Sequence, residues 1–169
     1  MNKIKAALTL WLLLYARSAL AQSVEKEPAA VVELGGVGNW NVKGGGSSLG
    51  PTVAVEFTPI KRWLELEVGV TPQFARHSTE WETDLLFKKP WDISKKVEFM
   101  MGVGPAWVRT NRSGMQRNSI SAEIAPDFMF WPSAKRRFGW YIEPGYEFNF
   151  ARGHEQSTGL TIGLLIAIR

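Results

Sequence analysis

Carboxylates set among apolar residues are the chemistry-bearing feature of this 169-residue sequence. In the stretch FGWYIEPGYEFNF, residues 138–150, Glu143 and Glu147 interrupt a run of aromatic and aliphatic side chains. Most of the large apolar residues share one parity and the two acids share the other, which is the two-residue period of a β-strand with two different faces. Carboxylates on an enclosed face cannot all stay ionised and unpaired, so they need basic partners, water or a bound cation.

The same alternation recurs along the chain, with many Gly and Ala residues between the acids. We predict that one polar face carries Glu56, Glu65, Glu67, Glu82, Asp84, Glu98, Glu123, Asp127, Glu143 and Glu147, and that Glu33 joins them. The favoured partners are arginines near the connections, namely Arg76, Arg109, Arg112, Arg117 and Arg152. A cation-binding interior is the alternative, with Glu65, Glu67, Glu82, Asp84, Glu143 and Glu147 as candidates. Two histidines and no cysteines favour neither a transition-metal site nor a cofactor.

Eight β-strands are needed to position these acids. The alternation predicts them at residues 29–39, 49–58, 62–76, 79–89, 96–109, 118–131, 138–150 and 157–168. Short connections at 59–61, 90–95 and 132–137 are expected to alternate with mostly longer, polar ones near 40–48, 76–79, 110–117 and 151–156. Four prolines fall inside these strands without breaking the parity, and the sequence offers no physical account of Pro72, Pro105, Pro126 and Pro144.

The fold class predicted is all-β, an eight-stranded antiparallel up-and-down transmembrane β-barrel whose apolar face meets lipid and whose acids line the interior. A soluble lipocalin-like barrel, with the faces inverted, is the alternative. The polar face separates the two, because it holds almost only acids and very small residues, as a narrow interior requires, with Lys88 as its one clear base. Tryptophans expected in two belts at the membrane interfaces are Trp40, Trp63, Trp81, Trp91, Trp107, Trp131 and Trp140.

The N-terminus has the pattern of a secretory signal peptide over residues 1–21, cleaved after Ala21, with a retained anchor as the alternative. A short polar lead, 22–28, and the barrel, 29–169, would follow. Without Lys3, Lys5 and Arg17, the 20 basic residues fall to 17 against 16 acids, so the basic charge of the full chain does not indicate nucleic-acid binding.

The export signal, the eight alternating strands, the aromatic belts and the final strand GLTIGLLIAIR resemble the small outer-membrane β-barrel superfamily, of the OmpX and opacity-protein type. The chain departs from that pattern at Ile168 and Arg169, where an aromatic residue is usual. The resemblance implies a porin-like protein in the outer membrane of a Gram-negative bacterium, in contact with outer-membrane lipid, lipopolysaccharide and the assembly machinery. A monomer is expected.

The function predicted is non-catalytic, in envelope integrity, structure or surface interaction. A soluble periplasmic carrier of an apolar ligand is the first alternative, and a lipid A-modifying enzyme is a weaker third. Catalysis is disfavoured because His77 and Ser78 are adjacent, and would point to opposite faces of a strand, while His154 and Ser157 have no evident acid partner.

The basic residues expected together at the short turns, facing anionic headgroups or water, are Lys61, Arg62, Lys88, Lys89, Lys95, Lys96, Lys135, Arg136 and Arg137.

Overall fold

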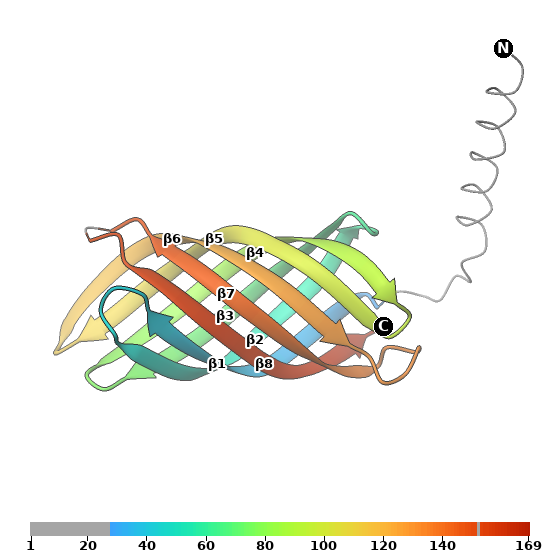
Figure 1. Ribbon diagram of the computed structural model, residues 1–169, viewed down its shortest axis with the longest axis horizontal. Coiled ribbons are helices and arrows are strands. Elements are labelled where there is room, and N and C mark those ends of the chain that lie inside the picture. The colour runs from blue at the N-terminus through green and yellow to red at the C-terminus, as the bar shows by residue number, and fades with distance from the viewer. Residues whose placement is uncertain (1–27, 152) are drawn as a thin grey trace, which may run out of the picture.

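The computed structural model describes residues 28–151 and 153–169, which form a closed barrel of eight antiparallel strands (Figure 1). The predicted signal peptide, 1–21, and all but the last residue of the polar lead lie outside the described residues. The strands are β1 (Ala30–Asn41), β2 (Ser47–Ile60), β3 (Leu64–Ala75), β4 (Ser78–Ser94), β5 (Val97–Arg112), β6 (Met115–Phe130), β7 (Phe138–Asn149) and β8 (Gln156–Ile168). Each strand pairs with its neighbours in sequence, and β8 returns to β1, which confirms the predicted fold class. Within the described chain, no helix is long and apolar enough to cross a membrane.

Six of the strands are longer than predicted, whereas β3 and β7 are slightly shorter. The expected connection at 90–95 is mostly part of β4, and the expected loop at 110–117 is reduced to Ser113 and Gly114. Both of these residues have a positive φ, 51° and 79°, as a tight two-residue hairpin requires. The predicted contrast between short turns and longer loops is therefore wrong, and the longest connection, 131–137, lies at the end expected to have short turns. Polar residues continue these strands beyond the apolar belt, and a drop in hydropathy alone does not mark a strand's end.

The two faces of the sheet differ as the alternation requires. Large apolar side chains cover the outer wall, and Val53, Val103 and Ile162 are each about half exposed, at 49%, 54% and 52%. The interior is polar over most of its length, with an apolar cluster at the end where the described chain starts and ends. This cluster consists of Val31, Met100, Met129, Trp131, Tyr141 and Leu165.

Trp131 corrects one of the predicted interface aromatics. Its side chain is only 2% exposed and lies inside the barrel, in the apolar cluster. The physical reason is parity, because Phe130 points outward and stacks on Trp140 with ring centroids 4.1 Å apart. The next residue along the chain, Trp131, must then point inward, so its position was predictable from the alternation. The other six predicted tryptophans are between 41% and 59% exposed, five of them on the outer face of strands and Trp63 in the connection between β2 and β3.

The mid-strand prolines lie at gaps in the hydrogen-bonded ladders. Between β2 and β3, beside Pro72, pairing stops after Leu49↔Phe74 and resumes at Val53↔Val70. Between β4 and β5, beside Pro105, it stops after Asp84↔Ala106 and resumes at Phe87↔Val103. Between β6 and β7, beside Pro126 and Pro144, it stops after Ile124↔Tyr146 and resumes at Phe128↔Ile142. Each proline remains paired on its other side, as in Pro72↔Trp81 and Pro105↔Ala122. The register is the same before and after each gap. A proline therefore interrupts the pairing only locally, and every later side chain stays on the same face of the sheet.

Candidate functional site in the barrel lumen

The structure places all the predicted acids on the inner side of the barrel or at its mouth. Buried among them are Glu33, Glu56, Glu65, Glu67, Glu82, Asp84, Glu98 and Asp127. Glu123, Glu143 and Glu147 are less deeply buried and line a cavity in the lumen. Because alternate residues of a strand point to the same face, the carboxylates of seven strands lie together in one enclosed interior.

Lys88 of β4 is the cation at the centre of this interior. Its side chain is fully buried, and its Nζ lies 2.8 Å from Glu143 Oε2 and 3.3 Å from Asp127 Oδ2. The same ammonium group contacts Glu67 directly and is 3.9 Å from Glu56 Oε2. Gly102, paired with Lys88 on β5, leaves room for the lysine stem, since a Cβ there would be 3.0 Å from Lys88 Cγ. One buried ammonium group therefore forms ion pairs with carboxylates from four other strands.

These contacts correct two predictions. Lys88 does not belong with the basic residues of the turns, because its parity directs it into the lumen. The favoured pairing of the acids with Arg76, Arg109, Arg112 and Arg117 is not the pairing that the structure shows, and Arg152 lies outside the described residues. Arg109 instead donates to Gln116 at 2.8 Å on the outer wall.

Arg136 is the second cation that enters the lumen, from the connection between β6 and β7. Its Nη1 is 2.6 Å from Glu98 Oε2 and its Nη2 is 2.9 Å from Asp92 Oδ1. Asp92 and Glu98 are directly opposite each other on β4 and β5, so the guanidinium neutralises a like-charged cross-strand pair. The long 131–137 connection allows this inward reach, which the sequence pattern did not indicate.

Two further pairs of acids are directly opposite across a ladder, Glu56↔Glu67 and Glu123↔Glu147. Like charges in such positions destabilise a sheet unless a counter-charge is present. Lys88 serves the first pair. The second pair lines a cavity whose described lining contains six carboxylates and no lysine or arginine. This cavity, called the upper cavity below, is therefore rich in carboxylates.

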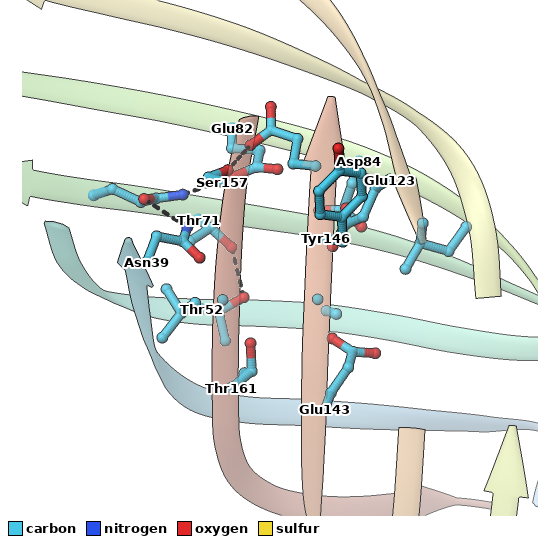
Figure 2. A pocket seen from close by; sticks show the side chains of 18 of the residues that line it. Asn39, Thr52, Thr71, Glu82, Asp84, Glu123, Glu143, Tyr146, Ser157 and Thr161 are labelled. Atoms are coloured by element: carbon cyan, nitrogen blue, oxygen red, sulfur yellow. Dashed lines mark hydrogen bonds between the residues drawn. The ribbon is translucent and has the colours of Figure 1, made fainter. Parts of the chain in front are cut away.

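Neutral oxygen donors complete the upper cavity, and Figure 2 shows Glu82, Asp84, Glu123 and Glu143 grouped around it. Gln73 is the hub of its hydrogen bonds: its Oε1 accepts from Asn39 at 2.8 Å and from Ser48 at 2.6 Å, and its Nε2 donates to Glu82 at 2.7 Å. Sequence reasoning missed Gln73, although its position between Thr71 and the strand end on the inner parity was a usable signal. Chemically, this lining of oxygen atoms suits cations.

Some buried polar atoms have no hydrogen-bond partner among the described residues. They include Glu33 Oε1, Glu56 Oε2, Asp127 Oδ1 and Trp131 Nε1. In addition, Glu33, Glu56 and Glu67 each bring one carboxylate oxygen within 4.8 Å of the other two. Such atoms are costly in a folded protein and mark a place where a further group can bind.

Two of the residues considered for catalysis, Ser157 and His154, have other contacts. The Ser157 hydroxyl donates to Glu147 at 3.1 Å, and the His154 ring stacks on Phe148 with centroids 5.6 Å apart. His77 lies in the two-residue connection between β3 and β4, and Ser78 begins β4.

No protein-family model and no curated protein matches this chain, so the comparisons rest on solved structures. Neisserial surface protein A is similar with a TM-score of 0.65 at 11% identity, covering 82% of this chain and 96% of that one. Ail, the attachment invasion locus protein of Yersinia pestis, gives 0.54 at 13%, covering 83% and 98%. The N-terminal β-barrel domain of Pseudomonas aeruginosa OprF gives 0.53 at 13%, covering 80% and 97%.

These similarities concern the fold. The three structures are small eight-stranded outer-membrane β-barrels, which confirms the resemblance drawn from the sequence. The outer-membrane enzyme PagL shares the fold as well, with a TM-score of 0.53 at 10% identity, covering 83% of this chain and all of that one. The chain thus has the fold of small outer-membrane β-barrels together with an apolar outer wall, and the fold alone is compatible with both catalytic and non-catalytic proteins.

Proposed function

We propose that this integral outer-membrane β-barrel acts in the integrity of the envelope, as a closed and non-catalytic structural component. The observation that carries the proposal is the filled interior. Lys88 and its carboxylates occupy the middle of the lumen, and the cluster around Trp131 occupies one end. An eight-stranded barrel has an interior just wide enough for side chains, so a lumen filled in this way is poorly suited to passive diffusion of solutes.

The outer wall supports an anchoring role. Trp91 and Trp140 lie toward one end of the barrel and Trp81 and Trp107 toward the other, where tryptophan is favoured at the two membrane interfaces. Lys89 Nζ lies 6.0 Å from the centre of the Trp91 ring, so a cation is held at one of these belts. We propose that the turn bases, except Lys88 and Arg136, face anionic lipid headgroups there. Lipid and lipopolysaccharide would then be the principal partners.

The two alternatives receive less support. A carrier of an apolar ligand needs Val53, Leu66, Ile142 and Ile162 around a cavity, whereas Val53 and Ile162 are about half exposed on the outer wall. A lipid A-modifying enzyme needs an activated nucleophile, and the Ser157 hydroxyl is bonded to Glu147 while His154 stacks on Phe148.

A surface-interaction role is the second candidate function. It is favoured by apolar side chains that stand exposed on the end of the barrel away from the chain termini. They include Leu49, Phe74, Met115 and Phe150, each at least 55% exposed. Because two connections at this end, 76–77 and 113–114, have only two residues each, such an interaction would use the rim of the barrel.

Deletion of the gene tests the proposed role. We expect the deletion strain to become sensitive to detergents and to large antibiotics that an intact outer membrane excludes, with full rescue by the wild-type gene. The purified barrel should give no steady ion conductance in planar bilayers. Unchanged sensitivity together with an altered lipid A profile would favour the enzyme, and stable channel openings would contradict the closed lumen.

A further inference from the structure

We propose that Glu33, Glu56 and Glu67 form a binding site for a hard divalent cation, with Ca²⁺ as the best fit. This inference does not depend on the proposed role in the envelope. It concerns three carboxylates on three consecutive strands, β1, β2 and β3, at one level of the lumen.

The strand register brings these three acids together. Glu56 is directly opposite Glu67, and Glu33 is one diagonal step away, since Glu56 pairs with Val31. One oxygen from each carboxylate lies within 4.8 Å of the other two. An ion at the centre of such a triangle would be at most about 2.8 Å from each oxygen, close to the range of roughly 2.3–2.6 Å that Ca²⁺ prefers.

Unpartnered buried oxygens are the independent observation that points to a ligand. Glu33 and Glu56 are 1% and 3% exposed, and Glu33 Oε1 and Glu56 Oε2 have no hydrogen-bond partner among the described residues. The Lys88 ammonium is committed to Glu67, Asp127 and Glu143 and is 3.9 Å from the Glu56 oxygen. A single positive charge is thus shared among more carboxylates than it can neutralise, and a second cation would restore the balance.

The donor set selects the class of cation. The three ligands are carboxylates, without histidine or cysteine, which favours hard ions over zinc or copper. Ca²⁺ accepts irregular oxygen geometry and a variable number of ligands, whereas Mg²⁺ demands a near-ideal octahedron and keeps its water.

A cavity lies on each side of the site. Glu67 lines the upper cavity, which shares Asn39, Gln73 and Glu82 with the open vestibule at the end of the barrel away from the termini. Glu56 lines the cavity at the other end, beside Trp131.

Equilibrium dialysis with ⁴⁵Ca²⁺ on the folded barrel in detergent micelles tests the site. After treatment with a chelator, the wild type should bind one Ca²⁺ per barrel, with weaker displacement by Mg²⁺. The double variant Glu33→Gln/Glu56→Gln should lose at least tenfold in affinity, since each Gln keeps the shape of Glu but loses its charge. Glu147→Gln is the matched control, because Glu147 lies in the upper cavity outside the trio, and it should bind as the wild type does.

Further variants keep the result decisive. Lys88→Met should bind Ca²⁺ more tightly, since the competing ammonium is gone. Folding of each variant is judged by the gel shift on boiling. If the double variant does not fold, the single variant Glu33→Gln replaces it in the binding measurement. No stoichiometric binding by the wild type would overturn the proposal. So would an equal loss in Glu147→Gln, which would indicate a diffuse attraction by all the lumenal acids.

Discussion

Lys88 has a fully buried side chain whose ammonium group contacts carboxylates of β3, β6 and β7. Removing one partner from a buried ionic cluster leaves the others without compensation, which costs more than the cluster contributes as a whole. The stability of the barrel should therefore depend on this residue far more than on any lysine of the turns.

Replacement of Lys88 by Met should destabilise the barrel by about 3–5 kcal/mol, because Glu67, Asp127 and Glu143 lose the one cation that contacts them among the described residues. The matched control is Lys89→Met, one residue further on the outer face, where the expected change is about 1 kcal/mol or less. The measurement is the urea dependence of folding in lipid vesicles, followed by the gel shift on boiling. Equal effects of the two substitutions would show that the lumenal network is not a main source of stability.

At this scale the sequence predicted the facing of the acids but not their partners. The parity of the strands identified Glu56, Glu67 and Glu143 as inward residues, because only local spacing was needed. The ion pair between Lys88 and Glu143 joins residues 55 positions apart across the lumen, and such a contact depends on barrel closure and strand tilt. Trp131 was misplaced because residue type was weighed above parity.

Among the elements, the interrupted ladders explain how the strands tolerate proline. At two of the gaps a glycine brings the backbones unusually close, since a Cβ on Gly50 would be 1.9 Å from the Pro72 carbonyl oxygen and one on Gly104 would be 1.8 Å from that of Leu85. Both positions therefore require glycine. At these two gaps the proline removes a backbone N–H donor from the ladder. The glycine has no Cβ and so allows the backbone of the neighbouring strand to approach closely.

Gly104→Ala should destabilise the barrel by roughly 2 kcal/mol or more, because the new methyl group would collide with backbone that cannot move aside. Gly46→Ala is the control, since nothing lies within 4 Å of a Cβ there, and it should change stability by about 0.5 kcal/mol or less. Folding yield and urea midpoints of the two variants would be compared in vesicles. A tolerant Gly104 would mean that the ladder relaxes around the gap, contrary to this account.

The strand count and order were predictable from the sequence, whereas the ends of strands were not. Eight segments of alternating hydropathy define eight strands, and an even number of antiparallel strands closes simply. The polar extensions of β5 and β6 carry no apolar alternation, so residues such as Arg112 and Met115 resembled loop. Pairing with the neighbouring strand keeps them extended, and that information is not local.

The whole molecule is defined by the opposition of its two faces, apolar outside and acidic inside. A shift of one residue in any of the strands β1 to β7 would turn carboxylates toward lipid and apolar groups into the lumen, so the closed register is strongly specified. The filled lumen, the tryptophan belts and the cation site all follow from that opposition, because each requires the acids to face inward.

Quenching of tryptophan fluorescence by lipid tests that opposition most directly. Two variants of the mature barrel would be folded into vesicles of lipids brominated near the headgroup, each with a single tryptophan and Phe at the other sites. One keeps Trp140, which is 41% exposed on the outer wall, and the other keeps Trp131, which is 2% exposed inside. The account predicts strong quenching of Trp140 and little of Trp131. Equal quenching of the two, or stronger quenching of Trp131, would contradict it.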